Sequence, residues 1–163
     1  MASRLNTIAG HRNSTSTYNT GKVQPKHDDD IVICSYARTA MTRARRGPQK
    51  DTPCEAMLAP VLKDVLAKAN NFDPKLVQEI CIGNVNQPGA GSTTSRMAQF
   101  LGEIPDTTPL YGINRLCSSG LQAIIDVANS IRAGQIDCGI GGGVESMSMY
   151  DMQKSIDPEK LSD

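Results

Sequence analysis

The sequence lacks tryptophan and has only two phenylalanines and two histidines among 163 residues. Both histidines, His11 and His27, lie in the polar first part of the chain, so a histidine-based zinc site is not expected. No apolar run approaches the roughly 20 residues that a membrane-spanning helix needs. The start of the chain also lacks the apolar core of a secretory signal. We therefore expect neither a metal centre nor a membrane span.

An excess of charge of one sign is absent as well. The 17 basic and 17 acidic residues give a net charge of zero, whereas nucleic-acid-binding domains carry an excess of basic residues. The five cysteines are odd in number and lack paired spacing, which disfavours a disulfide framework and favours a reducing compartment. The length suits one domain that buries about 70% of its unfolded surface. These counts predict an ordinary globular domain without nucleic acid as a partner.

Residues 1–29 are rich in Ser, Thr, Asn and charged residues and show no sustained periodicity. This composition predicts a disordered leader. An ordered domain is expected over residues 30–150, and residues 151–163 have the character of a loop that leads onward. We therefore expect one folded domain between two irregular ends.

Short apolar runs alternate with amphipathic segments along the domain. Strands are predicted at 31–36, 79–84, 108–113 and 137–143, and helices at 53–70, 94–101 and 121–133. Thr52 and Glu55 have the spacing of a capping box, Asp73-Pro74 predicts a short helical turn, and Gly134 suits a left-handed helix end. This alternation predicts an α/β fold, a mostly parallel sheet with helices on both faces.

Cys117 lies between the predicted strand 108–113 and the predicted helix that begins near Leu121. The first turn of a helix has unpaired N–H groups with partial positive charge, which favours the thiolate, the nucleophilic form of cysteine. The same N–H groups can bind the oxyanion that forms when a thioester is attacked. A buried structural cysteine is the alternative for the residue taken alone. Cys117 is therefore the candidate catalytic nucleophile.

The surrounding motifs resemble those of the thiolases, most closely the peroxisomal 3-ketoacyl-CoA thiolases. The specific stretches are Asn-Arg-Leu-Cys-Ser-Ser-Gly-Leu-Gln-Ala at 114–123 and Gly-Gly-Gly-Val-Glu-Ser-Met-Ser at 141–148. Further matching stretches are Arg-Thr-Ala at 38–40, Gly-Asn-Val at 83–85, Gln-Pro-Gly-Ala-Gly at 87–91 and Arg-Met-Ala-Gln-Phe-Leu at 96–101. The resemblance runs from about Asp30 to Tyr150 and implies the N-terminal half of the thiolase fold.

The resemblance implies an acyltransferase of fatty acid β-oxidation that cleaves 3-ketoacyl-CoA with free CoA. By the same resemblance, Cys117 carries the acyl group, CoA is a substrate, and no cofactor is bound permanently. Thiolases are longer chains and at least dimers, and they use a histidine in a Gly-His-Pro motif and a second cysteine in a Cys-x-Gly-Gly motif. Neither motif occurs in these 163 residues. An acetoacetyl-CoA thiolase and an inactive, truncated thiolase-like chain that acts as an assembly partner remain alternatives; the related condensing synthases match the motifs less well.

The helix at 121–133 is apolar around much of its circumference. One apolar face holds Leu121, Ile124, Ile125, Ala128 and Ile131, with Ala123 and Val127 beside it. Such a helix is expected to be covered on more than one side. In the thiolase fold this helix lies between two similar sheets, one from each half of the chain. We therefore expect an exposed apolar patch on a chain that ends at Asp163.

The leader contains Arg4, Leu5 and His11 with the spacing of an N-terminal peroxisomal import signal. Arg12 departs from that signal, which has an apolar residue at this place, and chance similarity in a basic tail is the alternative. The resemblance implies a peroxisomal protein that an import receptor binds. The cytoplasm and the mitochondrion are the other compartments considered.

Other candidate residues are assigned structural roles. Cys34 and Cys81 are expected in the core, Cys138 is expected to be buried, and Cys54 is interpreted as structural although it lies near a helix start. The cluster of Arg43, Arg45 and Arg46 is interpreted as a solvated loop rather than a site for CoA phosphates. The glycines at 141–143 lack the spacing of a dinucleotide fingerprint and predict close approach of a neighbour or ligand. Glu145 is assigned no chemical role.

Overall fold

The computed structural model describes residues 27–152. The chain divides into two compact units, residues 1–32 and 33–163. In the first unit the described residues form a turn, in which the backbone N–H of Asp30 donates to the carbonyl of His27 at 3.1 Å. Most of the predicted leader and of the predicted final loop, residues 1–26 and 153–163, lies outside the described residues.

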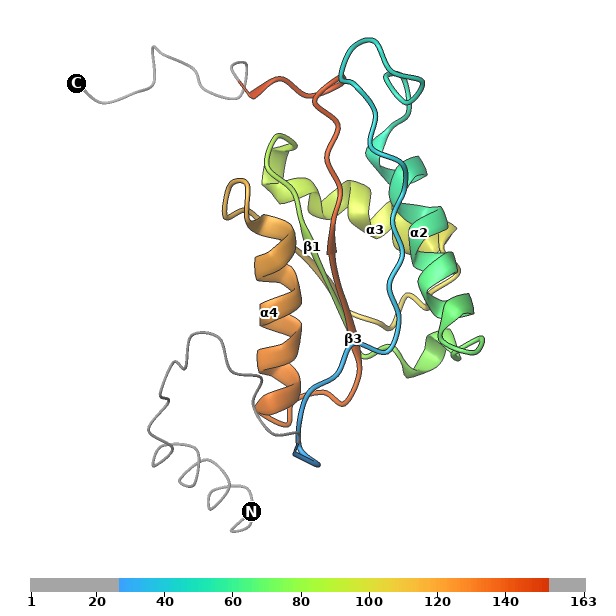
Figure 1. Cartoon of the computed structure of the whole chain (residues 1–163), viewed down its shortest axis with the longest axis vertical. Helices are drawn as coiled ribbons and strands as arrows, with labels where there is room; N and C mark the ends of the chain where they lie inside the picture. The colour runs from blue at the N-terminus through green and yellow to red at the C-terminus, as the bar shows by residue number, and fades with distance from the viewer. Residues whose placement is uncertain (1–26, 153–163) are drawn as a thin grey trace, which may run out of the picture. The chain divides into compact units, whose positions relative to one another are not determined.

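The second unit is built on a parallel sheet of three strands in the order β2-β1-β3 (Figure 1). The strands are β1 (Glu79–Gly83), β2 (Leu110–Ile113) and β3 (Gly139–Gly143). In the register, Cys81 of the central strand lies opposite Tyr111 on one side and Gly141 on the other. The predicted parallel sheet is therefore confirmed.

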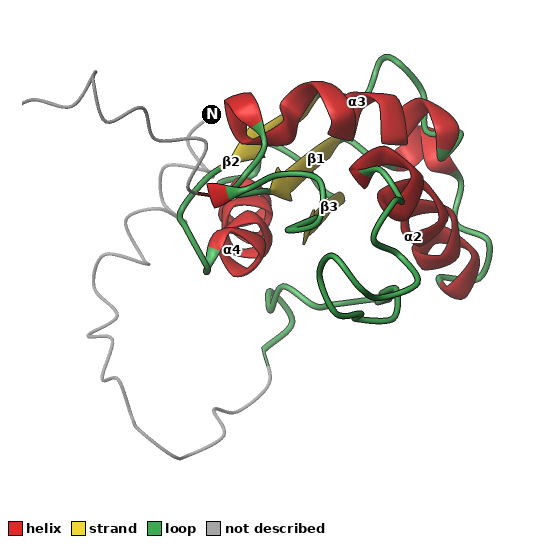
Figure 2. Cartoon of the chain, turned by 90° about the horizontal axis from the view of Figure 1, so that it is seen from above, coloured by secondary structure: helices red, strands yellow, loops and turns green. Residues whose placement is uncertain are grey.

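Helices cover both faces of the sheet, as predicted. Figure 2 shows α2 (Cys54–Lys68) and α3 (Ser92–Leu101) on one side of the strands and α4 (Ser119–Arg132) on the other. Short 3-10 helices occur at η1 (Pro74–Leu76) and η2 (Pro88–Gly91). Gly134, with φ of 68°, follows the end of α4 in the expected left-handed conformation. None of the helices described between residues 27 and 152 has both the length and the apolar character needed to cross a bilayer.

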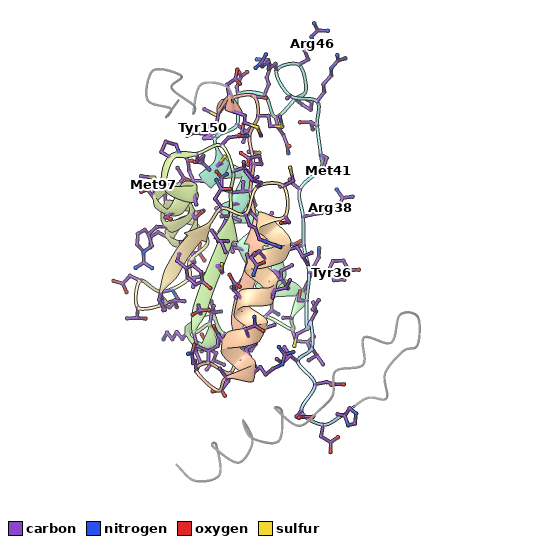
Figure 3. The ribbon with its side chains drawn as sticks, turned by 90° about the vertical axis from the view of Figure 1, so that its left-hand side faces the viewer. Tyr36, Arg38, Met41, Arg46, Met97 and Tyr150 are labelled. Atoms are coloured by element: carbon purple, nitrogen blue, oxygen red, sulfur yellow. The ribbon has the colours of Figure 1, made fainter. Side chains whose placement is uncertain are left out.

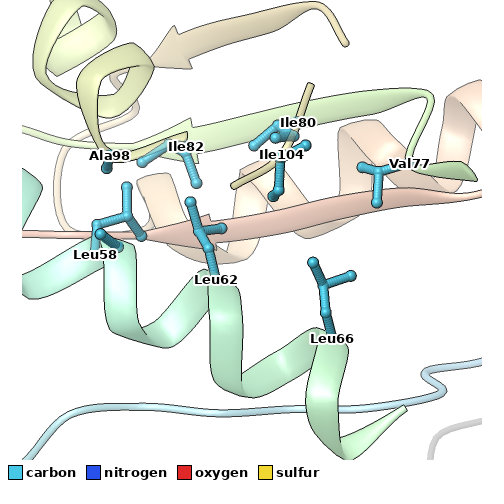
Figure 4. Packing of buried hydrophobic residues seen from close by; sticks show 9 residues of the cluster. Leu58, Leu62, Leu66, Val77, Ile80, Ile82, Ala98 and Ile104 are labelled. Carbon is cyan, nitrogen blue, oxygen red and sulfur yellow. The ribbon is translucent and has the colours of Figure 1, made fainter. Parts of the chain in front are cut away.

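The central strand separates two hydrophobic clusters, because successive side chains of a strand point to opposite faces. On one face, Ile80 and Ile82 pack against α2 and α3. Figure 4 shows the side chains of this cluster, which are Leu58, Ala59, Leu62, Leu66, Val77, Ile80, Ile82, Ala98 and Ile104. On the other face, Cys81 packs with Ala123 and Val127 of α4. Both clusters are dominated by residues that the predicted elements contain.

The glycines of β3 allow α4 to approach the sheet closely. A Cβ on Gly141 would lie 2.7 Å from the Cα of Ile124, and a Cβ on Gly143 would lie 3.2 Å from the Cα of Gly120. At Gly141 a Cβ would clash with the helix backbone, and at Gly143 it would require the neighbouring backbone to move by a few tenths of an ångström. The close neighbour that the glycines predicted is therefore the backbone of α4.

The predicted strand at 31–36 is not formed. None of these residues belongs to a described strand, and Ile33 and Tyr36 are 76% and 84% exposed. Figure 3 shows Tyr36, Arg38 and Met41 along an extended segment. The described sheet consists of β2, β1 and β3, and residues 31–36 do not pair with the free edge of either outer strand. Apolar composition alone therefore predicted a strand that has no hydrogen-bonded partner among the described residues.

Two predicted helix starts also differ. The N-cap of α2 is Pro53, no side chain caps it, and the capping box expected from Thr52 and Glu55 is absent. Helix α3 begins at Ser92, two residues earlier than predicted, after Gly91 takes φ of 66°. By contrast, the turn after Asp73 is confirmed: its Oδ1 accepts a hydrogen bond from the N–H of Lys75 at 2.9 Å.

Candidate active site

The carboxyl ends of β1 and β2 form the part of the sheet where a ligand is expected. The chain leaves β1 toward α3 on one face, and it leaves β2 toward α4 on the other face. In open α/β sheets, ligands bind where the connections of adjacent strands diverge in this way. The two connections are joined here, because Asn114 Nδ2 donates to the carbonyl of Val85 at 3.0 Å. Cys117 lies in the second connection and its side chain is exposed.

The loop that carries Cys117 is held by side chains of its own. Asn114 Oδ1 accepts a hydrogen bond from the N–H of Leu116 at 2.9 Å. Ser119 Oγ accepts one from the N–H of Arg115 at 2.8 Å and donates to the carbonyl of Leu116. Leu116 adopts φ of 50°, a left-handed conformation that costs a residue with a Cβ roughly 1–2 kcal/mol. The hydrogen bonds from Asn114 and Ser119 compensate for this strain.

Helix α4 starts at Ser119, two residues after Cys117 and two residues earlier than predicted. Ser118 is the N-cap, and its carbonyl accepts the N–H of Gln122 at 2.9 Å as the helix begins. The backbone of Cys117 forms an isolated bridge with that of Arg115. Cys117 therefore places an exposed thiol beside the positive end of a helix.

The N-terminus of α4 lies directly on the end of β1. A Cβ on Gly83 would be 2.4 Å from the carbonyl carbon of Ser119 and 2.6 Å from the nitrogen of Gly120. Only glycine leaves room for this contact. Gly83 thus determines how far the first turn of α4, and with it the Cys117 loop, stands above the sheet.

Two polar residues join the ends of β1 and β3. Asn84 is 1% exposed, its Nδ2 donates to the carbonyl of Val144 at 2.5 Å, and its Oδ1 accepts the N–H of Gln87 at 2.8 Å. Glu145 Oε2 accepts the N–H of Val85 at 2.8 Å. These contacts assign Glu145 a structural role, as expected, and they show a role for Asn84 that the sequence analysis missed. The sequence signal that could have indicated this role is the polar residue Asn84 directly after the apolar run of β1.

The other cysteines differ from Cys117 in exposure. Cys81 is buried as predicted, and Cys54 is buried too, which raises its pKa to about 11 because burial disfavours the thiolate and Glu145 adds a nearby negative charge. Cys138 is half-buried rather than buried, and burial raises its pKa. The expectation that Cys34 lies in the core is wrong, because it is exposed in the segment that forms no strand. Cys34 and Cys117 are the exposed thiols of residues 27–152.

The arginine cluster is exposed, in agreement with a solvated loop. Arg45 Nη2 pairs with Asp151 at 2.9 Å, and the N–H of Arg45 donates to Ser148 Oγ at 2.8 Å. Figure 3 shows Arg46 pointing away from the body of the structure. The loop is thus attached to the segment that follows β3.

Two small cavities lie away from Cys117. One of about 210 Å³ is lined by Gln87, Pro88, Gly91, Thr93, Thr94 and Tyr150. Another of about 290 Å³ lies between the end of α2 and the α3–β2 connection, where Lys63 pairs with Glu103. Cys117 lines neither cavity, and the described part of the chain holds no cluster of His, Cys, Asp and Glu suited to a metal ion. The candidate nucleophile therefore stands on an open surface of the described residues.

Comparisons with known proteins support the assignment that the motifs suggested. The family model described as "Thiolase, N-terminal domain" matches residues 31–161. The peroxisomal 3-ketoacyl-CoA thiolase of Yarrowia lipolytica is 44% identical over 155 residues, which is 95% of this chain and 37% of that protein.

Solved structures show the same fold. The dimeric peroxisomal thiolase of Saccharomyces cerevisiae superposes with a TM-score of 0.75 at 36% identity, over 85% of this chain and 35% of that one. A second structure of peroxisomal 3-ketoacyl-CoA thiolase from the same yeast has a TM-score of 0.73 at 38% identity, over 77% of this chain and 37% of that one. It is described as a five-layered α-β-α-β-α structure built from two core domains of identical topology.

The chain spans little more than a third of the length of these relatives. The family model covers most of the chain, and the sheet, the helices on both faces and the Cys117 loop are all contained in the matched residues. The chain therefore belongs to the thiolase family, and residues 31–161 correspond to the family's N-terminal domain.

Proposed function

We propose that Cys117 is the nucleophile of a thiolase reaction that converts 3-ketoacyl-CoA and CoA into acetyl-CoA and an acyl-CoA two carbons shorter. The observation that carries the proposal is the exposed thiol of Cys117, held at the N-terminus of α4 where the connections of β1 and β2 diverge. The names of the peroxisomal 3-ketoacyl-CoA thiolases at 44% identity support the substrate class.

The reaction proceeds through a covalent acyl-enzyme. The Cys117 thiolate attacks the 3-keto carbon, the bond between carbons 2 and 3 breaks, and its electron pair leaves on acetyl-CoA as a carbanion. An acid protonates that carbanion; family resemblance assigns this role to the cysteine of a Cys-x-Gly-Gly motif, which these 163 residues lack. The thiolate of CoA then attacks the acyl thioester, releases the shortened acyl-CoA and regenerates Cys117. CoA is thus a substrate, and no permanently bound cofactor is invoked.

The backbone N–H of Cys117 is the proposed donor to the oxyanion of the acyl-transfer step. Its place beside the N-terminus of α4 supports this role. A preorganised donor of this kind contributes because charge develops on the thioester oxygen only in the transition state.

A second core domain is the proposed cover of α4. Leu121, Ile124 and Ile125 are 60%, 41% and 39% exposed, which leaves an apolar surface on the side of α4 away from the sheet. The yeast structure with two core domains of identical topology supports this arrangement, and the dimeric yeast structure supports a homodimer as the working state. The missing acid and histidine motifs would come from that second domain.

The peroxisome is the proposed location. The peroxisomal relatives support it. The import signal proposed at Arg4, Leu5 and His11 lies outside the described residues and stays a prediction.

Intact mass spectrometry with acetoacetyl-CoA tests the proposed function. We expect an acetyl adduct on the wild-type chain and on Cys34→Ser, which removes the other exposed thiol, and no adduct on Cys117→Ser. An adduct that persists in Cys117→Ser, or one that is lost in Cys34→Ser, would contradict the proposal.

A further inference from the structure

The Cys117 loop is stabilised by two side chains that flank it in sequence and form hydrogen bonds with its backbone. Asn114 precedes the loop and Ser119 follows it as the first residue of α4. Ser119 is 3% exposed, so its hydroxyl is buried beneath the loop. Their hydrogen bonds engage the backbone of both residues before the nucleophile, Arg115 and Leu116.

We propose that Asn114 and Ser119 are positioning residues, which hold Cys117 in the field of the first turn of α4; as a statement about the reaction, this rests on the proposed function. Neither side chain needs to touch the substrate. Their effect passes through Leu116, whose left-handed backbone, with φ of 50°, turns the chain so that Cys117 precedes the helix directly.

Each residue supplies a different part of this support. Asn114 forms an Asx turn through Oδ1, and its Nδ2 donates to the carbonyl of Val85, which ties the loop to the connection after β1. The Ser119 hydroxyl both accepts and donates, so it links the N–H of Arg115 to the carbonyl of Leu116. Removal of either side chain releases Leu116 from its strained conformation and lets the thiol move away from the helix N-terminus.

Alkylation of individual cysteines by iodoacetamide tests the proposal without requiring turnover. In the 163-residue chain at neutral pH, Ser119→Ala and Asn114→Ala should each lower the alkylation rate of Cys117 about threefold, the scale of a helix-terminus effect on a thiolate. Ser119→Thr keeps the hydroxyl that accepts the N–H of Arg115 and should restore the wild-type rate. Asn114→Ser supplies a hydroxyl that can accept the N–H of Leu116 but lacks the Nδ2 donor to Val85, so it should restore the rate in part. Ser130→Ala, at the far end of α4, is the matched control, because Ser130 Oγ bonds Glu79 instead.

The buried thiols Cys54 and Cys81 report on the fold in the same experiment, since they react only if the structure opens. Slower labelling of Cys117, with Cys54 and Cys81 still unlabelled and with rescue by Thr or Ser, supports positioning. Unchanged Cys117 rates in both alanine variants overturn it. A change accompanied by labelling of Cys54 and Cys81 also overturns it and assigns the two side chains to stability.

The acetoacetyl-CoA adduct keeps the two claims separate. An adduct that persists in Cys117→Ser refutes the proposed function, whereas the alkylation rates still decide whether Asn114 and Ser119 position Cys117. An adduct on the wild type with unaffected alkylation in both alanine variants refutes the positioning inference alone.

Discussion

Gly83, the last residue of β1, packs against Ser119, the first residue of α4, so closely that a Cβ on Gly83 would lie 2.4 Å from the Ser119 carbonyl carbon. This contact sets the height of the α4 N-terminus above the sheet. Because Cys117 immediately precedes that turn, the packing of a glycine in the sheet bears on the candidate nucleophile. The contact between Gly83 and Ser119 therefore affects the position of the candidate nucleophile.

Gly83→Ala is expected to displace the first turn of α4. The added methyl meets backbone atoms that cannot rotate away, so the free energy of unfolding should fall by about 1–3 kcal/mol. Gly142→Ala is the matched control, because its Cβ would meet only Ile82 Cδ1 at 3.9 Å. Urea denaturation of both variants measures the difference, and equal stability of the two would contradict the close contact.

Cys54 should make the chain less stable in alkaline solution. Its pKa is about 11 in the folded chain against an ordinary value of 9.0, so between pH 9 and pH 11 the folded state keeps a proton that the unfolded state has lost. The free energy of unfolding therefore decreases as pH rises through that window. Burial raises the pKa of Cys81 in the same direction, so Cys54→Ala should reduce the slope without removing it. Denaturation curves at several pH values would show an undiminished slope in Cys54→Ala if this account is wrong.

Asn84→Ala should destabilise the carboxyl edge of the sheet. The change removes the partner of two backbone groups, the carbonyl of Val144 and the N–H of Gln87, in a buried place. A loss of about 1–3 kcal/mol is expected for buried groups left without a partner. Asn129→Ala, on the exposed side of α4, is the control and should stay within about 0.5 kcal/mol of the wild type. Thermal unfolding that ranks the two variants equally would speak against the bridging role of Asn84.

The outer face of α4 should drive association of the 163-residue chain. Leu121→Glu combined with Ile124→Glu replaces exposed apolar side chains with charge, so self-association in sedimentation velocity should decrease while the fold is kept. Asn129→Glu adds charge outside this apolar group and should leave association unchanged. Identical sedimentation of the wild type and the double variant would show that this face has no affinity for a partner.

Local patterns predicted the elements whose apolar residues lie in the core. The central strand β1 and the helix after Cys117 occur where periodicity placed them, and Gly134 ends the helix as expected. Burial of Ile80 and Ile82 on one side and Cys81 on the other follows the alternation of a strand. These features depend on residues close together in sequence.

Features that depend on distant residues were predicted poorly. The apolar patch expected on α4 is exposed at Leu121, Ile124 and Ile125, but the sequence did not show that Ala123 and Val127 are the apolar residues buried against the sheet. The reason is the glycine strand β3, which lets the helix approach so closely that only small side chains fit between them. Cys34 was predicted to lie in the core because it belongs to an apolar run. Such a run does not show whether the segment will pair with a strand of the sheet, and this segment does not.

The candidate site was predicted in part. Cys117 was identified from the motif and its place before a helix, and the structure places it there with an exposed thiol. The support from Asn84 and Ser119 was not foreseen, because a buried amide or hydroxyl is recognised only when its partners across the fold are known. The role of Cys117 as the nucleophile stays a prediction.

Residue-resolved competition between substrate and alkylating reagent tests that role most directly. The chain is incubated with acetoacetyl-CoA and then with isotopically labelled iodoacetamide, and peptide mapping compares Cys117 with Cys34, the other exposed thiol. If Cys117 accepts the acyl group, its label is lost while Cys34 is labelled fully. Loss of label at Cys34 alone, or equal loss at both cysteines, would contradict the assignment of Cys117 as the nucleophile.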